Sequence, residues 1–254
     1  ENLVRLLMKN RNRRSKPIGC DNFEGWEPIT RVLEVDQTPI GKTPRSCPAT
    51  YVGIWNDVRR LFAQTLEARM RGYSAGRFSF NIAGGRCDGC EGQGLRKIEM
   101  NFLPDVRIRC ERCNSARFNS ETLKVKYRDK NIAEVLAMSV DEATVFFSTH
   151  PKLEHTLKLL QHVGLGYLPL GQQSPTLSGG EAQRLKLVAE LTKARPRIDK
   201  TNVGPRHTLY VLDEPTIGLH MADVEKLIHV LHQLVDAGNT VITIEHNLDI
   251  IAEA

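Results

Sequence analysis

Residues 177–184 read LSGGEAQR, and the run that follows them has apolar residues at helical spacing. Ser178 and Glu181 are spaced like the two partners of a capping box, which predicts that a helix begins here. Gly179 and Gly180 leave the first amides of that helix unshielded, and a helix N-terminus favours anions. An ordinary capped helix is the plainer interpretation. Two adjacent glycines are a poor choice for stability alone, so we favour phosphate binding.

A strand–helix–strand pattern lies near the C-terminal end. Its first strand ends in Asp213 and Glu214, and its second strand is followed by Glu245 and His246. Such a unit has parallel strands whose carboxyl ends open at one edge. We expect Asp213 to hold Mg²⁺ there and Glu214 to polarise an attacking water, with His246 close to both. Two capping acids in a loop are the alternative. The expected elements are a strand over 208–212, a helix over 221–237 and a strand over 240–244.

Four of the six cysteines form two C-x-x-C pairs, Cys87 with Cys90 and Cys110 with Cys113. Two such pairs at this separation are typical of a tetrahedral zinc site. Because four thiolates leave no open position, the site would be structural. A thioredoxin-like redox pair is the less favoured alternative.

The segment between the two pairs predicts a β-hairpin. Apolar and polar residues alternate over 97–102 and over 106–109, and a turn signal lies at 103–105. The hairpin would have one apolar face and would be closed at its base by the metal. Arg107 and Arg109 share its polar face, where they can approach a phosphate backbone or simply be solvated. The sequence leaves that choice open.

Gln37 follows a predicted strand over residues 29–35. A glutamine just past a strand end can reach a metal-bound nucleotide or its water, although most exposed glutamines have no such role. The loop after it, residues 38–48, contains three prolines and a glycine, which exclude a helix or strand. Further expected elements are helices over 50–71, 131–138, 140–147 (capped by Ser139 or Asp141) and 151–163, and a strand over 123–127.

Composition places few limits on function. The chain has 254 residues, a net charge of +5 and 41% hydrophobic residues, which is ordinary for a globular protein. This mildly basic balance, concentrated partly in residues 1–16, permits nucleic-acid binding without requiring it. A flexible basic loop is expected over residues 194–207. No apolar run approaches a membrane span. Metal-type cysteine spacing fits a reducing compartment, so we expect a cytoplasmic protein.

A phosphate loop of the form G-x-x-x-x-G-K-[ST] does not occur in the sequence. The nearest candidate, Gly41-Lys42-Thr43, lacks the earlier glycine, and Pro44 prevents a helix from continuing there. The chain also begins at Glu1, without Met. We therefore expect it to be a fragment of a longer protein.

Residues 177–184 resemble the signature motif of ABC-type ATPases, and residues 208–214 resemble their Walker B motif with a catalytic glutamate. A four-cysteine module lies between the loop that carries Gln37 and the signature motif. For this reason the chain resembles the second half of the UvrA family, the A subunit of the bacterial excision nuclease. Cys47, Ser115 and Ala116 depart from the usual family residues, and the loop over 194–207 is long, as in class II paralogues. The matching stretches are residues 37–41, 48–51, 87–94, 102–105, 177–184, 212–220 and 245–249.

The resemblance implies an α/β fold: a partial ABC-type ATPase core interrupted by a helical signature lobe with a four-cysteine zinc β-hairpin module. The implied domains are ATP-binding core at 1–46 and 194–254, and signature lobe at 47–193, with the zinc module at 84–127. The implied cofactors are ATP, Mg²⁺ and structural Zn²⁺. The implied site residues are Glu214, His246 and Gln37 for catalysis, Asp213, Leu177, Ser178, Gly179, Gly180, Glu181 and Gln183 for nucleotide binding, and Cys87, Cys90, Cys110 and Cys113 for the metal.

The resemblance also implies a function. Such a protein dimerises with itself, and each signature helix caps ATP held by the phosphate loop of another half. ATP binding and hydrolysis govern how it grips damaged double-stranded DNA for nucleotide excision repair, and the zinc module of this half takes part in damage recognition. The B subunit binds the half that is not present here. No membrane association is implied. Without a phosphate loop, this chain alone is expected not to hydrolyse ATP.

One alternative fits the sequence equally well, and three others account for less of it. A paralogue acting in drug resistance shares all the motifs. A transporter ATPase shares the signature and Walker B motifs but has no use for a zinc-closed hairpin. An SMC-like protein would carry a heptad coiled coil in place of the hairpin. A non-enzymatic zinc-dependent DNA-binding module explains the cysteines but leaves Asp213 and Glu214 without a role.

Overall fold

The computed structural model describes residues 19, 24–25, 27–41, 43–98, 100, 105–193 and 207–254. Four sequence-based predictions therefore fall outside the described residues, wholly or in part. They concern the basic segment at 1–16, Lys42, most of the hairpin turn and the loop before residue 207.

A three-stranded parallel sheet forms one end of the described structure, with the order β1-β6-β7. Its strands are β1 (Ile29–Val35), β6 (His207–Asp213) and β7 (Thr240–Ile244). Helix α10 (Met221–Asp236) connects β6 to β7, which confirms the predicted strand–helix–strand unit. Val35 pairs with Leu212, and Asp213 pairs with Ile244. The segments that follow the three strands therefore leave the sheet at one edge.

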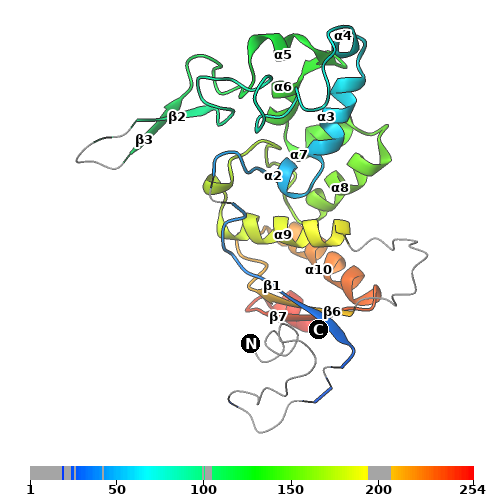
Figure 1. The fold of residues 1–254 in the computed structure, drawn as a ribbon. Coiled ribbons are helices and arrows are strands. Elements are labelled where there is room, and N and C mark those ends of the chain that lie inside the picture. Colours follow the sequence, from blue (N-terminus) through cyan, green and yellow to red (C-terminus); the bar gives the residue numbers. More distant parts are fainter. Residues whose placement is uncertain are drawn as a thin grey trace.

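A lobe of short helices lies on the other side of α9 (Gly179–Lys193), as Figure 1 shows. The hairpin of β2 (Leu95–Ile98) and β3 (Val106–Arg109) projects from this lobe. Short α11 (Leu248–Ala252) follows β7. The other elements of the lobe are α2 (Pro48–Tyr51), α3 (Trp55–Gln64), α4 (Leu66–Met70), α5 (Ser120–Lys124), β4 (Lys126–Tyr127), β5 (Lys130–Asn131), α6 (Ile132–Ala137), α7 (Val140–Phe146), α8 (Pro151–His162) and the 3₁₀ turn η1 (Ser174–Thr176).

Two sequence-based predictions are wrong in part. The single helix expected over 50–71 is divided into α2, α3 and α4, because Gly53 has a φ of 86° and Thr65 is extended. Thr65 begins a new helix, since its side chain accepts a hydrogen bond from the Ala68 amide. The strand expected over 123–127 begins instead as the end of α5, which Asn119 caps through the Thr122 amide. In both places apolar periodicity marks the buried residues but does not mark the caps.

Capping side chains also set the start of three other helices. Ser139, one of the two caps predicted for α7, forms a capping box with Glu142, and Asn131 caps α6. Ser178 and Glu181 form the predicted box at α9: the Glu181 amide donates to Ser178 Oγ at 3.2 Å, and the Ser178 amide donates to Glu181 Oε2 at 2.7 Å. Local chemistry therefore determines where each of these helices begins.

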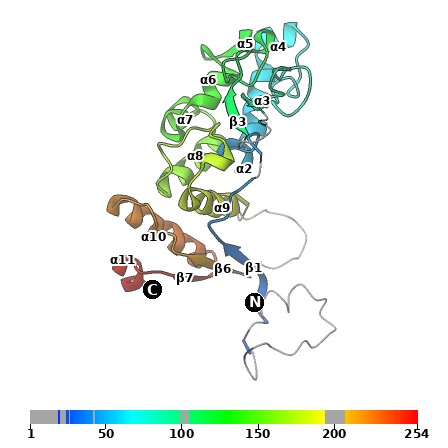
Figure 2. The ribbon, with the colours of Figure 1, turned by 90° about the vertical axis from the view of Figure 1, so that its left-hand side faces the viewer.

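Helix α9 is buried on nearly all sides, because the lobe covers one side and the sheet the other (Figures 1 and 2). Polar side chains contribute to its contact with the sheet. Gln183, which is 1% exposed, donates through Nε2 to the carbonyls of Val35 at 2.9 Å and Asp213 at 2.7 Å. Glu190 pairs with Arg31 at 2.7 Å. One helix face is thus fixed to the ends of β1 and β6.

Lys186 lies between Gln183 and Glu190 on this polar face of α9. Its ammonium donates to the Asp36 carboxylate, and it reaches the Thr38 hydroxyl at 2.8 Å. This hydrogen bond from Lys186 lowers the pKa of the Asp36 carboxyl. The loop that carries Gln37 is therefore held against α9.

No helix in the described part of the chain is both long enough and apolar enough to cross a membrane.

We predict that Gln183→Ala lowers the free energy of unfolding by about 2 kcal/mol, because a buried carbonyl and a partly buried one are left without their hydrogen-bond donor. Urea denaturation followed by circular dichroism measures the change. Gln233→Ala makes the same chemical change at an exposed position of α10 and should cost less than about 0.5 kcal/mol. An equal loss of stability in both variants would contradict a special role for Gln183.

Candidate metal and nucleotide sites

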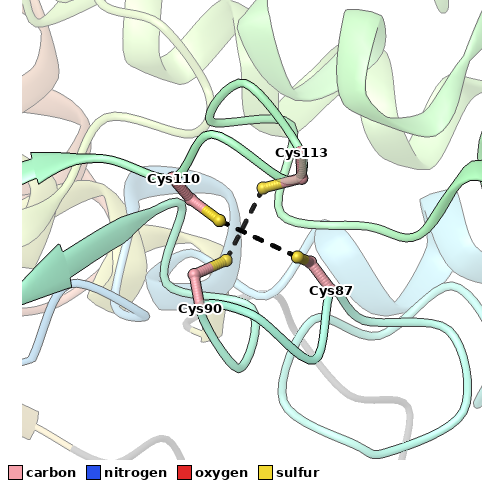
Figure 3. A group of neighbouring side chains, drawn as sticks. All are labelled: Cys87, Cys90, Cys110 and Cys113. Carbon is pink, nitrogen blue, oxygen red and sulfur yellow. Dashed lines mark hydrogen bonds between the residues drawn. The ribbon is translucent and has the colours of Figure 1, made fainter.

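The four predicted cysteines converge on one point inside the hairpin base (Figure 3). All four are buried, and their sulfurs lie within 4.8 Å of one another. Cys87 Sγ is 3.9 Å from Cys110 Sγ, and Cys90 Sγ is 3.6 Å from Cys113 Sγ. A tetrahedral zinc centre with bonds of about 2.3 Å places its sulfurs roughly 3.8 Å apart. The sulfur positions therefore fit Zn²⁺.

Backbone amides point at these sulfurs, as they do around metal-bound thiolates. The Gly94 amide donates to Cys90 Sγ at 3.2 Å, and the Arg117 amide donates to the Cys113 sulfur. Burial raises the pKa of the Cys90 and Cys113 thiols despite these hydrogen bonds. For Cys110, burial also raises the pKa, but hydrogen bonds from backbone amides and neighbouring thiols outweigh it and leave the pKa lowered. A divalent cation would stabilise these sulfurs as thiolates.

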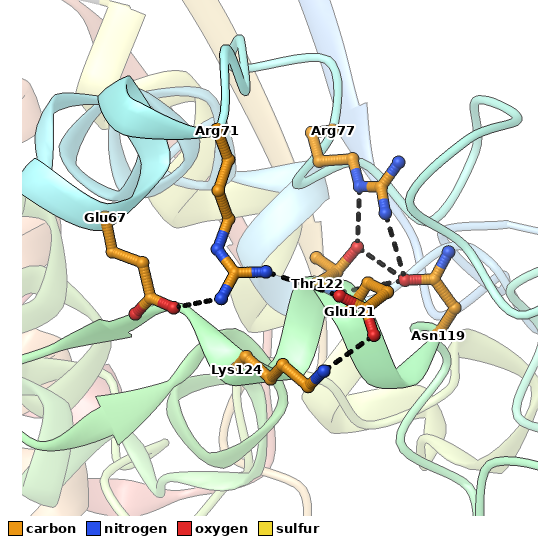
Figure 4. Close-up of polar contacts among 7 residues, drawn as sticks. All are labelled: Glu67, Arg71, Arg77, Asn119, Glu121, Thr122 and Lys124. Carbon is orange, nitrogen blue, oxygen red and sulfur yellow. Dashed lines mark hydrogen bonds and ion pairs between the residues drawn. The ribbon is translucent and has the colours of Figure 1, made fainter.

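The base of the metal module is fixed to the lobe by a polar network (Figure 4). Asn119 Nδ2 donates to the Gly84 carbonyl at 2.9 Å, and Thr122 Oγ1 donates to the Gly85 carbonyl at 3.1 Å. Arg77 Nε in turn donates to Thr122 Oγ1 at 3.0 Å. Gly85 is required because a Cβ there would lie 1.6 Å from the Arg77 carbonyl oxygen. The module is thus held rigidly at the point where its chain enters and leaves.

A second part of this network joins α4 to α5. Arg71 bridges Glu67 at 2.7 Å and Glu121 at 3.3 Å, and Lys124 pairs with Glu121 at 2.7 Å (Figure 4). These exposed pairs contribute little individually. They connect the helix that precedes the four cysteines in sequence to the helix that follows them.

The hairpin has the two faces that its sequence predicts. Cross-strand register pairs Lys97 with Arg107 on one face and Ile98 with Val106 on the other. Arg109 shares the face of Lys97, opposite Leu95. All eight residues of β2 and β3 except Leu95 are exposed. The structure therefore presents to solvent a basic face and a largely apolar face, on which Arg96 lies opposite Ile108.

Glu214 and His246 meet at the edge of the sheet. His246 Nε2 lies 3.4 Å from Glu214 Oε1. Glu214 has a φ of 46°, and its amide donates to the Ile244 carbonyl at 2.8 Å, so the turn after β6 is tied to the end of β7. Strained backbone of this kind is concentrated at functional sites. Asp213, beside this pair, is exposed.

Glu245 was not among the predicted site residues, although it precedes His246. Its Oε1 accepts from the Thr216 amide at 2.8 Å and hydroxyl at 2.7 Å, and its Oε2 accepts from the His246 amide at 3.0 Å and the Asn247 amide at 3.2 Å. Burial raises the pKa of Glu245, but these hydrogen bonds outweigh it and leave the pKa lowered. Glu245 therefore joins the loop after β6 to the loop after β7. Its neighbours in sequence carry no signal for this role.

The signature segment is approached closely by two other loops. A Cβ on Gly179 would lie 2.9 Å from Gln37 Oε1, and a Cβ on Gly180 would lie 2.8 Å from the Ile217 carbonyl oxygen. The structure thus brings Gln37 to the start of α9. Gly180 is needed here for close packing against a backbone carbonyl, which adds a role to the anion binding predicted for it.

Predicted site residues therefore form two groups. The four cysteines make one group in the lobe. At the sheet edge, Glu214 lies beside His246, Gln37 lies against Gly179, and Gln183 binds the backbone of Asp213. The side chain of Gln183 is committed to strand carbonyls. Leu177 is partly buried against the core, and Glu181 accepts a hydrogen bond from the Tyr167 hydroxyl at 2.5 Å.

No protein-family model matches the chain, but curated relatives do. The UvrABC system protein A of Streptococcus pyogenes serotype M3 is 56% identical over 245 residues, which are 96% of this chain and 25% of that protein. The protein of the same name from Micrococcus luteus is 59% identical over 233 residues, which are 92% of this chain and 23% of that protein. The chain thus spans about a quarter of the length of these relatives.

A solved structure is also similar. The crystal structure of UvrA2 from Deinococcus radiodurans matches with a TM-score of 0.80 and 53% identity, covering 89% of this chain and 27% of that one. Together with the four-cysteine cluster, this match confirms the predicted α/β fold class.

We predict that the chain binds one zinc ion. Cys87→Ser and Cys110→Ser should each abolish binding, since a thiolate ligand is removed, and should lower the melting temperature. Elemental analysis after gel filtration measures the metal. Cys47→Ser is the matched control, because Cys47 is also buried but stands outside the cluster. A protein purified without zinc, or cluster variants that retain it, would contradict the assignment.

We predict that Glu245→Gln lowers the free energy of unfolding by about 1 kcal/mol at pH 7, since a partly exposed carboxylate loses charged hydrogen bonds. Because the pKa of Glu245 is lowered in the folded state, this stability is present above its usual value of 4.5 and disappears as the pH falls through the folded pKa. The difference from the unsubstituted protein should therefore shrink in acid. Urea denaturation at pH 7 and pH 4 tests this, with exposed Glu225→Gln as control. A pH-independent difference would argue against the carboxylate.

Proposed function

Because the chain belongs to the UvrA family over the quarter of its relatives' length that it spans, we propose that it works within an ATP-dependent subunit of nucleotide excision repair. The contact of 3.4 Å between Glu214 and His246 carries this proposal. It lies at the strand edge to which Gln183 attaches the signature helix. The metal module at the far side of α9 supplies the second element of the proposed function.

The proposed reaction is ATP hydrolysis. In it, Glu214 orients and polarises the attacking water, His246 contacts the transferred phosphate, and Gln37 reaches the metal or the water. Asp213 would hold Mg²⁺, which neutralises charge on the phosphates. Residues 177–181 would cap ATP from the opposite side of a homodimeric or half-to-half interface, using the amides at the start of α9.

The proposed target of the lobe is damaged double-stranded DNA. Lys97, Arg107 and Arg109 share one exposed hairpin face, and Arg and Lys contacts to phosphates supply most non-specific affinity. Val106 and Ile98 on the other face are exposed as well and can contact bases where a lesion has opened the stack. Zinc would fix the base of the hairpin so that the whole ribbon moves with the lobe.

The remaining parts of the proposal follow the family. We propose ATP-binding core at residues 1–46 and 194–254, a signature lobe at 47–193, a cytoplasmic location, and loading of the B subunit by the half of the protein outside this chain. A paralogous role in drug resistance is the second candidate, favoured by the long segment at 194–207. The similarity to the protein named UvrA2 fits either role.

We predict that the 254-residue chain alone does not turn over Mg·ATP, because its sequence contains no phosphate loop. A chimera in which these residues replace the matching segment of the Micrococcus luteus relative should hydrolyse ATP. In that chimera, Glu214→Gln should reduce kcat by about 100-fold or more. Exposed Glu253→Gln is the control. If the isolated chain hydrolysed ATP and Glu214→Gln abolished that activity, the proposal that the site needs a phosphate loop from outside this chain would be wrong.

We predict that the double variant Arg107→Gln, Arg109→Gln weakens binding to duplex DNA in the same chimera. The slope of log K against log salt should fall by about 0.9 for each DNA phosphate that the variant no longer neutralises. Fluorescence anisotropy from about 50 to 200 mM salt measures both quantities. Two exposed lysines on other elements, Lys130 and Lys226, are changed to Gln as the charge-matched control. An identical slope in both double variants would exclude the basic hairpin face from DNA binding.

A further inference from the structure

Arg117 is a buried cation beside the four-cysteine cluster. The residue is 4% exposed, and none of the ion pairs among the described residues involves it. Its Nη2 donates to the Gly171 carbonyl at 2.7 Å, and its guanidinium lies over the Phe80 ring, 5.1 Å from the centroid. Its Nη1 is buried without a hydrogen-bond partner in the described structure. A guanidinium in such a place costs folding free energy unless a negative charge faces it.

The groups around Arg117 belong to the metal cluster. Its amide donates to the Cys113 sulfur, and its carbonyl accepts from the Cys87 amide at 2.9 Å. A Cβ on Gly94 would lie 3.3 Å from Arg117 Cγ, so the side chain runs along the turn that donates to Cys90. The backbone of Arg117 thus contacts the cluster, and its side chain packs along the turn beside Cys90.

Four thiolates and one Zn²⁺ together carry two net negative charges. In a buried centre these charges need a cation or hydrogen-bond donors nearby. Arg112 is close in sequence, but its side chain is exposed, and Arg86 is only half-buried and donates to the Asn81 carbonyl at 3.4 Å. Arg117 is the buried cation that lies against the ligand loops.

We propose that Arg117 is the built-in counter-cation of the metal centre and that its hydrogen bond to Gly171 ties the centre to the loop preceding the signature helix. Its charge favours the metal-bound state, in which the four sulfurs are thiolates. Without metal that compensation is lost, and the same guanidinium stays buried with an unpartnered Nη1. Arg117 therefore acts as a positioning residue whose charge stabilises one state of the module and destabilises the other.

This inference rests on the proposed zinc site, and two substitutions separate its two parts. Arg117→Lys keeps the charge, and Arg117→Gln keeps an amide donor for Gly171 while removing the charge. Arg112→Gln removes the same charge from an exposed side chain next to the cluster. Competition with a colorimetric zinc chelator measures affinity in the 254-residue chain, and thermal denaturation measures stability with and without zinc.

We expect Arg117→Gln to weaken zinc binding about tenfold or more, in line with other residues that support metal ligands. Arg117→Lys should retain most of the affinity, and Arg112→Gln should match the unsubstituted chain. The melting temperature of Arg117→Gln should fall in the zinc form and stay unchanged or rise in the metal-free form.

Two results would overturn the inference. The first is that Arg117→Gln binds zinc more tightly than Arg117→Lys. That result would mean that the hydrogen bond to Gly171, and not the charge of Arg117, supports the metal centre. The other is an equal fall in melting temperature with and without zinc, which indicates packing alone. If the unsubstituted chain binds no zinc, the proposed metal site itself fails, and that outcome is separate from both.

Discussion

The two hydrogen bonds of the Gln183 amide are the constraint on which the arrangement of the molecule depends. They join α9 to the carbonyls of Val35 and Asp213, where β1 and β6 end. An apolar helix face can slide over a sheet by a fraction of a residue at little cost, but a donor with two fixed acceptors cannot. Because the lobe packs on the other side of α9, Gln183, together with Lys186 and Glu190, also fixes the lobe relative to the strand edge.

The metal module is connected to the same region by separate contacts. Arg45 donates to the Glu91 carbonyl at 3.2 Å and pairs with its carboxylate at 3.1 Å, and Gln173 donates to the Gln93 carbonyl at 3.3 Å. Arg45 follows the Gln37 loop in sequence, and Gln173 precedes the signature. A displacement of either loop of the proposed nucleotide site would therefore be transmitted to the hairpin base. These polar contacts of Arg45 and Gln173 are a physical basis for coupling between the proposed nucleotide site and the proposed metal site.

Sequence alone predicts the strands of the sheet, the strand–helix–strand unit, the hairpin and the cysteine cluster, because each follows from short-range periodicity or spacing. It places Glu214 and His246 together because parallel strands open at one edge. It misses the breaks at Gly53 and Thr65, where backbone conformation overrides helical periodicity. It also misses Glu245, because a carboxylate that binds four donors in two loops leaves no periodic pattern.

The same reason explains why sequence predicts α9 only as an amphipathic helix. Its predicted apolar stripe is buried, but so are Gln183 and Arg184. The cost of burying these groups is offset in part, because each donates to backbone carbonyls at the ends of strands and turns: Val35 and Asp213 for Gln183, and Ile217 for Arg184 at 3.1 Å. Gln183 Oε1 and Arg184 Nε have no partner in the described structure. Arg117 makes the corresponding contact to Gly171 in the metal module. In both places a polar side chain satisfies a backbone carbonyl and fixes one unit against another. A pattern of apolar residues cannot encode these interactions, which hold the strand edge and the four-cysteine cluster in their places against the rest of the fold.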